Sequence, residues 1–385
     1  MTYLRIKGLK FIVKFDIKIL YIILIKVLYL YLIFIKMKVT FHKILLKKRF
    51  PLAISRGVHG DSYNVFIRVE KDGIIGWGES APGKNEGAET PDQVISQLQK
   101  LIQTNIDNKS IYEIEKTARE IKISPCSYAG LDIALWDWKA KKANTPLHKL
   151  LGLPLPKIKT SVTLGIMSAE AAMERIPKLF DRITAKYLKV KLGSPEGIEA
   201  DKKMYSQVLE SIKPYNVSLR VDANGGWDLE NAKHMIEWLS KRKCDYVEQP
   251  LAEGMEKNLK ILFENRLLPI FVDESCRFSH NIIDYSDWID GVNLKLMKCG
   301  GITEALRILS TAKAFGLETM IGCMSESSIS ISAGASISGQ IDHIDLDSHY
   351  NLNPDPASGA KMINGVTMPR IAPGHGAYLV NENII

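Results

Sequence analysis

Three acidic residues, Asp222, Glu248 and Asp273, each end a short apolar stretch and follow one another at steps of 26 and 25 residues. If these stretches are neighbouring strands, the carboxylates converge in one partly buried site, where three like charges cannot all persist alone. A divalent cation would resolve the repulsion. An all-oxygen set without histidine or thiolate favours a hard ion such as Mg²⁺ over zinc. The alternative is that each carboxylate caps a helix or pairs with a surface lysine.

Lysines accompany these acids in the same kind of position. Lys189 and Lys191 are two residues apart, so in a strand both side chains lie on one face. Two such ammonium groups lower each other's pKa toward use as a general base, unless the pair is solvated on an edge strand. Lys295 ends a later stretch, and one base on each face of a substrate suits removing a proton from one side and returning one to the other. Lys298 competes for this role, but it precedes two glycines and we expect it in a loop.

Four further polar residues lie near the ends of other apolar stretches. Asp345 and Asp347 place two carboxylates on one face, which suits a substrate ammonium group or, alternatively, a helix cap. Cys323 is as readily explained as a small residue that lines a pocket as by a chemical role, and we expect no nucleophilic role for it. Thr163 belongs to the first stretch. No histidine ends a stretch together with a matching aspartate, so the sequence does not support a Ser-His-Asp mechanism.

The elements that must position these residues are eight short apolar stretches separated by segments of helical periodicity. We predict strands at residues 161–166, 187–192, 217–222, 246–249, 270–274, 291–296, 318–323 and 344–347. Eight strand–helix units over about 200 residues match a (β/α)8 barrel, whose active site lies at the carboxyl ends of the strands. A doubly wound sheet is the alternative, but no G-x-G-x-x-G follows any predicted strand.

The preceding residues predict a different kind of structure, an α+β unit. Residues 63–69 alternate between apolar and polar, and Asp72-Gly73 is a hairpin turn signal before a second strand at 74–78. Helical periodicity follows at 91–121, and residues 128–142 form a strongly amphipathic run.

The charge of the chain is concentrated in its first tenth. Of the net charge of +8 over 385 residues, residues 1–36 carry +6, from seven Lys and Arg against one Asp. The remainder is nearly neutral, so we expect no nucleic-acid partner.

Within that head, residues 19–35 are apolar apart from tyrosines and Lys26, which would cost roughly 2.5–3.5 kcal/mol at a bilayer centre. The head is therefore a signal or membrane anchor, an ordered apolar extension, or a segment outside the working protein. We favour the last interpretation, with Met37 as the natural start, because residues 37–41 begin a plausible strand. Membrane contact is expected only if the head is a real anchor.

The cysteines bear on the cellular compartment. Cys126, Cys244, Cys276, Cys299 and Cys323 are scattered and form no C-x-x-C pair. This odd, unclustered set argues against a disulfide framework and a structural zinc site, and it favours the cytoplasm.

Five sequence motifs resemble those of a known family. They are Lys189-Val190-Lys191, Val221-Asp222-Ala223-Asn224, Val247-Glu248-Gln249-Pro250, Asp273-Glu274-Ser275 and Asn293-Leu294-Lys295-Leu296-Met297-Lys298. In this order and spacing the chain resembles the enolase superfamily, in its muconate-lactonizing subgroup, over about residues 37–375. Within that subgroup, residues 321–328 and Asp345-Leu346-Asp347 resemble the dipeptide epimerases of the L-Ala-D/L-Glu type.

The resemblance implies an α/β fold with a TIM-like barrel of seven or eight (β/α) units at residues 156–350. An N-terminal α+β capping domain at 37–155 would be completed by residues 351–385. The implied activity is that of an isomerase that inverts the α-carbon of the C-terminal residue of an L,L-dipeptide. By analogy with the family, we also expect a homo-oligomer.

The resemblance also implies the roles of the charged residues. Asp222, Glu248 and Asp273 would hold one Mg²⁺ per subunit, which binds the substrate carboxylate and stabilises an enediolate. Lys191 and Lys295 would act as acid and base on opposite faces of the substrate.

The remaining implied roles concern substrate binding. Lys189 would hold the substrate carboxylate and tune its neighbouring lysine. Asp345 and Asp347 would receive the dipeptide's ammonium group, and Thr163 and Cys323 would line the pocket.

Substrate preference is implied by residues 50–57, a loop that touches the substrate side chain in this family. In Ala-Glu epimerases an arginine there binds the Glu carboxylate, and either Ser55 or Arg56 occupies that position here. Arg56 is therefore a candidate for binding an acidic second residue, while a broader or hydrophobic preference stays open.

Two other functions remain as alternatives. A muconate cycloisomerase or o-succinylbenzoate synthase would act on substrates without an ammonium group, which would leave Asp345 and Asp347 without a partner. A non-catalytic binding module is disfavoured because the lysines and carboxylates are all present.

Overall fold

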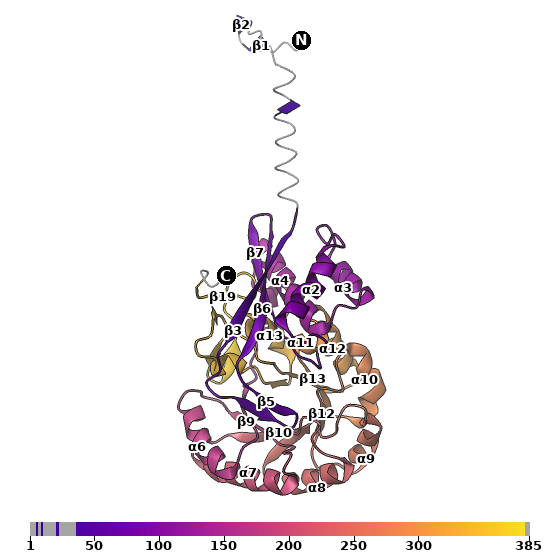
Figure 1. The fold of residues 1–385 in the computed structure, drawn as a ribbon, viewed down its shortest axis with the longest axis vertical. Coiled ribbons are helices and arrows are strands. Elements are labelled where there is room, and N and C mark those ends of the chain that lie inside the picture. Colours follow the sequence, from indigo (N-terminus) through magenta and orange to yellow (C-terminus); the bar gives the residue numbers. More distant parts are fainter. Residues whose placement is uncertain (1–4, 7–8, 11–20, 23–35, 382–385) are drawn as a thin grey trace.

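The computed structural model describes residues 5–6, 9–10, 21–22 and 36–381 (Figure 1). The predicted apolar stretch 19–35 lies outside the described residues except at 21–22, so its three interpretations stay predictions. Ahead of it, strands β1 (Arg5–Ile6) and β2 (Leu9–Lys10) pair antiparallel. Among the described residues, no helix combines the length and the apolar character that crossing a bilayer requires.

Eight parallel strands form the barrel in the lower half of Figure 1, in the spatial order β15-β14-β13-β12-β11-β10-β9-β8. A parallel bridge between Thr160 and Ile344 joins the two edges of this sheet and closes the barrel. The prediction of a TIM-like (β/α)8 barrel is therefore confirmed. The strands are β8 (Ser161–Leu164), β9 (Tyr187–Lys191), β10 (Ser218–Asp222), β11 (Cys244–Glu248), β12 (Ile270–Val272), β13 (Gly291–Leu294), β14 (Glu318–Ile321) and β15 (His343–Ile344).

Helices surround these strands on the outside (Figure 1). Side-chain caps set where several of them begin: Ser168 accepts from the backbone of Ala171, and Asp228 from that of Asn231. The helices are α6 (Ala169–Phe180), α7 (Ile198–Ser211), α8 (Leu229–Ser240), α9 (Leu259–Glu264), α10 (Ser279–Tyr285), α11 (Leu296–Cys299), α12 (Ile302–Ala314) and α13 (Ser328–Ile337). Short 3₁₀ turns are η1 (Lys213–Tyr215), η2 (Glu256–Asn258), η3 (Ser286–Trp288), η4 (Ser338–Gln340) and η5 (Ser348–Asn351).

The cap, which lies above the barrel in Figure 1, is an antiparallel sheet of β3 (Lys38–Leu46), β6 (Ser62–Lys71) and β7 (Ile74–Ser80). Its predicted hairpin turn is confirmed, because Asp72 and Gly73 join β6 to β7 with φ values of 56° and 71°. Positive φ at both residues is what a type I′ turn requires. The cap helices are α2 (Pro91–Ile102), α3 (Ile111–Glu120), α4 (Pro125–Lys142) and α5 (Leu147–Leu150).

Two details of the cap differ from the sequence expectation. The helical periodicity at 91–121 belongs to two helices, because Ser110 begins α3 with a capping box of its own. Helix α4, expected to be amphipathic, is buried nearly all round. It lies directly on β7, where a Cβ at Gly78 would come within 1.9 Å of the Gly130 carbonyl oxygen. Glycine in β7 thus brings α4 into contact with the sheet.

The C-terminal segment returns to the cap. Its strands β16 (Ala357–Ser358) and β19 (Tyr378–Leu379) pair, as do β17 (Lys361–Ile363) and β18 (Val366–Met368). Leu352 and Leu379 pack with Leu46 and Trp77 of the cap in one buried cluster. We propose on this basis the division into a cap at 37–155, a barrel at 156–350 and a cap-completing segment at 351–385.

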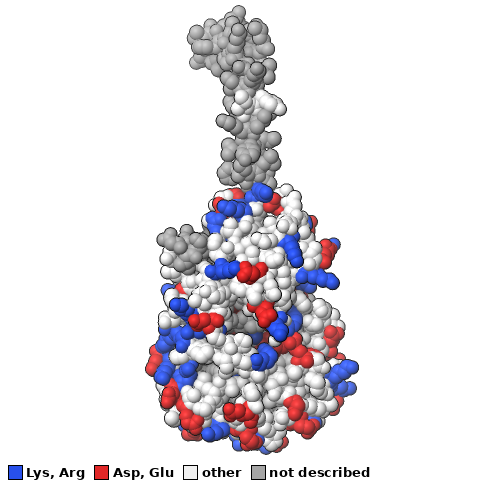
Figure 2. All heavy atoms as spheres, in the orientation of Figure 1, with Lys and Arg blue, Asp and Glu red and all other residues white. Residues whose placement is uncertain are grey.

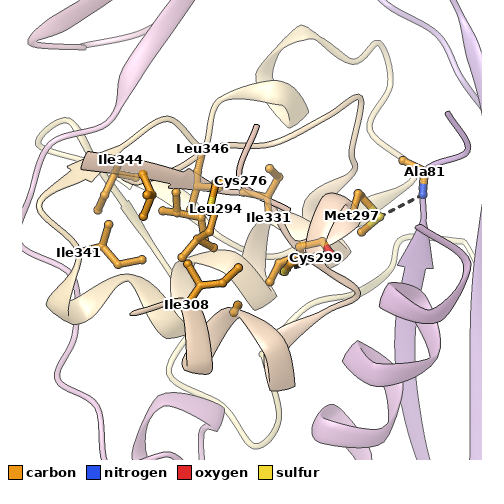
Figure 3. Close-up of a cluster of buried hydrophobic side chains, with 14 of the residues drawn as sticks. Ala81, Cys276, Leu294, Met297, Cys299, Ile308, Ile331, Ile341, Ile344 and Leu346 are labelled. Carbon is orange, nitrogen blue, oxygen red and sulfur yellow. Dashed lines mark hydrogen bonds between the residues drawn. The ribbon is translucent and has the colours of Figure 1, made fainter. Parts of the chain in front are cut away.

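The barrel core continues into the cap without a break. Figure 3 shows the buried side chains between strands and helices, among them Leu294, Ile308 and Ile344. At its edge the backbone N–H of Ala81, just after β7, donates to Met297 Sδ at 3.2 Å (Figure 3). On the outer surface, basic and acidic side chains are interspersed over the face shown in Figure 2.

A buried polar contact also fixes the cap on the barrel. The Asp132 carboxylate of α4 accepts from the Thr303 hydroxyl at 2.5 Å and from its backbone N–H at 3.0 Å. The same hydroxyl accepts from Trp136 Nε1 at 2.9 Å. Burial raises the pKa of Asp132 to about 7 even with these donors.

Replacing Thr303 with valine keeps the side-chain shape but removes that hydroxyl. We expect the free energy of unfolding to fall by about 1–3 kcal/mol, because a buried carboxylate and an indole N–H lose a partner. Urea denaturation measures the change, and Thr303→Ser, which keeps the hydroxyl, is the matched control. Equal losses in both variants would contradict a stabilising role for the hydroxyl.

Candidate active site

A cavity of about 740 Å³ opens at the carboxyl ends of the barrel strands, beneath the cap. Nine of the eleven residues that the sequence nominates line it: Arg56, Thr163, Lys189, Lys191, Asp273, Lys295, Cys323, Asp345 and Asp347. The other two, Asp222 and Glu248, are completely buried at 0% exposure and are paired with lysines that line the cavity. All eleven side chains therefore belong to one region.

The three predicted metal ligands meet as the sequence suggested. Asp222 and Glu248 end β10 and β11 as register partners, and Asp273 directly follows β12. One carboxylate oxygen from each lies within 4.8 Å of those of the other two. All three are at most 1% exposed, and their donors are all oxygen, which is the environment a hard divalent cation prefers. The residues present thus fit Mg²⁺.

The mutual repulsion of these acids is visible in their pKa values. Burial and the charge of Asp222 raise the pKa of Glu248 to about 7. Burial also disfavours ionisation of Asp222, but the ammonium groups of Lys191 and Lys189 outweigh it and lower that pKa to about 2. The protein therefore compensates the acids with its own cations.

Each acid of the triad has a lysine partner. Lys191 Nζ lies 2.5 Å from Asp222 Oδ2, and Lys295 Nζ lies 2.5 Å from Asp273 Oδ2. Lys189 Nζ lies 2.7 Å from Glu248 Oε2 and 2.9 Å from Asp345 Oδ2. With Lys298, which is described below, four lysines and four acidic groups thus form the buried charged network of the site.

The expected mutual lowering of lysine pKa values is wrong for Lys189. Burial does act to lower its pKa, but the carboxylates of Asp345, Glu248 and Asp222 raise it well above the ordinary value. The carboxylates in contact with this ammonium group therefore decide the direction of the pKa shift.

Lys191 and Lys295 lie on opposite sides of the barrel mouth. Lys191 ends β9 and Lys295 follows β13, and three strands separate these two on either side of the closed eight-stranded ring. Both side chains are nearly buried at 7% exposure and line the same cavity.

Lys298 does not lie in a loop, contrary to the sequence expectation. It belongs to the short helix α11, is 1% exposed, and donates to Asp273 Oδ1 at 2.7 Å and to the Asn293 carbonyl at 2.7 Å. One helical turn from Lys295, it lies on the Asp273 carboxylate and holds that group in place.

Three hydrogen-bonding residues of the site received no role in the sequence reasoning. Asn293 donates to Glu248 Oε1 at 2.7 Å, and Gln249 accepts from the backbone N–H of Asp273 at 2.8 Å. Asn224 donates to Asp222 and to Glu274. Position was the available sequence signal for two of them, since Asn224 and Gln249 follow a predicted ligand by two residues and by one. In the structure these two adopt left-handed φ values of 44° and 39°. Such backbone conformations in residues other than glycine concentrate at functional sites.

The acids after β15 form a second charged subsite. Asp347 Oδ2 accepts from the Thr163 backbone N–H at 2.7 Å, and burial together with the charge of Asp345 raises the pKa of Asp347 to about 7. Asp345 Oδ1 is buried and has no hydrogen-bond partner among the described residues. A cationic group of a ligand would relieve both features.

Cys323 lies beside this pair and keeps its proton. Its Sγ donates to the Asp345 carbonyl at 3.3 Å, and burial and the charge of Asp347 raise the pKa of the thiol well above its usual value. This agrees with a pocket residue rather than a thiolate nucleophile.

The loop expected to touch the substrate is a hairpin of β4 (Leu52–Ile54) and β5 (Gly57–His59). Of its two candidates for contacting the substrate, Arg56 lines the cavity, with its guanidinium bonded to Glu274 and to the Asn224 carbonyl. The Ser55 hydroxyl also donates to the Asn224 carbonyl.

Comparison with known proteins identifies the family to which this chain belongs. Residues 36–152 match the model of the mandelate racemase / muconate lactonizing enzyme N-terminal domain, and residues 170–383 match that of the enolase C-terminal domain-like family. The chain belongs to the mandelate racemase / muconate lactonizing enzyme family of the enolase superfamily.

Relatives within this family are named for reactions on dipeptides. A hydrophobic dipeptide epimerase of Flavobacteria bacterium (strain MS024-2A) is 62% identical over 90% of this chain and 99% of its own. One of Roseobacter litoralis is 53% identical over 89% and 99%. A dipeptide epimerase of Enterococcus faecalis V583, solved with Mg and L-Leu-L-Tyr, superposes with a TM-score of 0.81 at 30% identity, covering 89% and 99%.

Replacing Glu248 with glutamine should lower the affinity for Mg²⁺ at least about 100-fold, because a ligand charge is lost. Replacing Lys298 with alanine should lower the affinity about 10-fold, because Lys298 holds the ligand Asp273 in place. Isothermal titration with Mg²⁺ measures both. Asp347→Asn alters an acid of the same cavity that lies outside the triad and forms no ion pair with its lysines, and its affinity should stay close to that of the unaltered chain. An equal loss in Asp347→Asn would contradict the assignment.

Proposed function

We propose that the chain is a Mg²⁺-dependent dipeptide epimerase that inverts the α-carbon of the C-terminal residue of an L,L-dipeptide. One observation carries this proposal: a Mg²⁺-type carboxylate triad lies between two lysines on opposite sides of the barrel mouth, and a separate pair of acids lies in the same cavity. The naming of the relatives as dipeptide epimerases supports it.

The separate acids distinguish a dipeptide from other substrates. Asp345 and Asp347 supply negative charge just after β15, next to Thr163 of β8, and the free ammonium group of a dipeptide would neutralise it. Substrates of muconate cycloisomerases and o-succinylbenzoate synthases carry no cation for this place.

The proposed chemistry is a two-base exchange of the α-proton. When bound, Mg²⁺ would supply a Lewis acid at the substrate carboxylate, which lowers the cost of the charge that develops as the α-proton leaves. Lys191 Nζ takes the proton from one face in its neutral form, and Lys295 Nζ returns a proton from its ammonium form to the other face. The roles exchange for the opposite epimer. Lys189 stays charged, held by Glu248 and Asp345, and contributes positive charge beside the carboxylate.

We propose a preference for hydrophobic dipeptides, with L-Ala-L-Glu as the second candidate. The cavity wall below the cap includes Leu52, Ile54 and Met167. The one arginine of the hairpin is already bonded to Glu274, so an acidic side chain would have to compete for it.

We propose the cytoplasm as the compartment, because all five cysteines are free thiols. Small dipeptides, and no nucleic acid, are the proposed ligands. A homo-oligomer is proposed as well, and Ile261 and Ile283 on neighbouring outer helices of the barrel, 45% and 62% exposed, support a contact surface.

An L,L-dipeptide library incubated with the enzyme and Mg²⁺ in D₂O should gain one mass unit at the C-terminal residue, most strongly for hydrophobic pairs. Mass spectrometry of the products gives both reaction and preference. N-acetylated versions of the best dipeptides are the control, and they should react at least about 100-fold more slowly since the buried acids lose their ionic partner. No exchange with any dipeptide would refute the proposal.

Lys191→Ala and Lys295→Ala should each lower epimerisation by about 10²–10⁴-fold, the usual contribution of a general acid or base. Each variant should still exchange the α-proton of the one epimer whose proton faces the remaining lysine, and the two variants should select opposite epimers. Proton NMR in D₂O with L,L and L,D substrates measures this. Lys298→Ala serves as the control, because high Mg²⁺ should restore it. If Lys295→Ala stays active while Lys298→Ala is dead at saturating Mg²⁺, the assignment of the second base is wrong.

A further inference from the structure

The β4–β5 hairpin is docked on the barrel. The backbone N–H of Ile166, after β8, donates to the Ala53 carbonyl at 2.8 Å. At the turn, Ser55 Oγ donates to the Asn224 carbonyl at 2.8 Å. The hairpin, a part of the cap region of the chain, thus contacts the ends of two separated barrel strands (Figure 1). Its residues Leu52, Ile54 and Arg56 line the cavity.

Two glycines make room for the tip of the hairpin. A Cβ at Gly193, after β9, would come within 3.2 Å of Ser55 Cβ, and one at Gly226, after β10, within 2.9 Å. Both distances are too short for an ordinary contact between carbon atoms. The strand-end loops of β9 and β10 therefore form a seat into which Ser55 fits.

Arg56 adds charged hydrogen bonds at this seat. Its Nη1 donates to the Asn224 carbonyl at 2.7 Å and its Nη2 to Glu274 Oε1 at 2.6 Å. The side chain of Glu274 is 9% exposed, whereas that of Arg56 is 40% exposed. The arginine therefore covers the buried carboxylate of Glu274 from the solvent side. Asn224 Nδ2 also donates to Glu274 Oε1 and to Asp222 Oδ2, each at 3.2 Å.

We propose that Arg56 is a positioning residue, a latch that holds the hairpin closed by binding Glu274 and the Asn224 carbonyl. The proposal rests on the proposed function and deepens it. The closed hairpin keeps Leu52 and Ile54 at the cavity as an apolar wall for the substrate side chain. Arg56 acts on any dipeptide through the hairpin and does not select an acidic one.

The first test measures hairpin opening in the intact chain. Hydrogen–deuterium exchange of residues 52–59, with and without Mg²⁺, should accelerate about 5-fold in Arg56→Ala, the loss expected for a charged hydrogen bond that is partly solvated. Glu274→Gln should accelerate it in the same way. Arg56→Lys, which can reach one of the two acceptors, should lie between Arg56→Ala and the unaltered chain. Arg182→Ala removes an exposed arginine from the rim of the same cavity and should leave the exchange unchanged.

The second test separates a latch from a substrate ligand. For Arg56→Ala the KM should rise by the same factor, about 5-fold, for a hydrophobic dipeptide and for L-Ala-L-Glu, with kcat changed less, because the lost energy is uniform binding. A rise confined to L-Ala-L-Glu would assign Arg56 to the acidic side chain and overturn the latch, as would unchanged hairpin exchange. If exchange accelerates but no dipeptide is turned over by the unaltered chain, the latch stands and the proposed function fails.

Discussion

The repulsion among three buried carboxylates is the constraint on which the rest of this site depends. Asp222, Glu248 and Asp273 lie too close together and too deep to be ionised without compensation. The chain answers with four lysines, three of which each contact one acid and one of which, Lys189, bridges the triad to Asp345. A divalent cation added to this network competes with ammonium groups for the same oxygen atoms. Metal binding and the charge of the lysines are therefore coupled, and a base role for either lysine requires that coupling.

The barrel makes this arrangement from local sequence. Each acid stands at or just after a strand end, so parallel pairing alone brings the carboxyl ends together, with Asp222 and Glu248 in direct register. For this reason the barrel and the convergence of ten of the eleven nominated residues could be predicted from the sequence, because strand periodicity and polar residues at strand ends are local signals. The eleventh, Arg56, was nominated through the family resemblance alone. The hairpin turn at Asp72-Gly73 was predictable for the same reason, because its signal lies in two adjacent residues.

What the sequence could not supply depends on contacts between distant segments. Lys298 was expected in a loop because two glycines follow it, yet residues 296–299 wind into one helical turn that carries its ammonium group back onto Asp273. The burial of α4 on every side needs both β7 and the barrel to be in place. The pKa of Lys189 is raised where the sequence predicted that it would be lowered. Its partner Asp345 lies 156 residues away in the chain, so the local sequence could not reveal this counter-charge.

The seam between cap and barrel shows why both parts belong to the site. Glu79 of β7 is completely buried, and it accepts from the backbone and the hydroxyl of Ser327 at the beginning of α13. Asn64 of β6 donates both to Glu79 and to the Ser325 carbonyl, two residues beyond the cavity-lining Cys323. A buried carboxylate is costly, and the amide groups of a helix N-terminus offset part of that cost. The contacts of Glu79 and Asn64 with residues 325–327 exist only when the cap is docked. The cap therefore orders the part of the pocket wall that is formed by the chain after β14. The barrel supplies the charges, and the cap fixes the shape of the space in which they act.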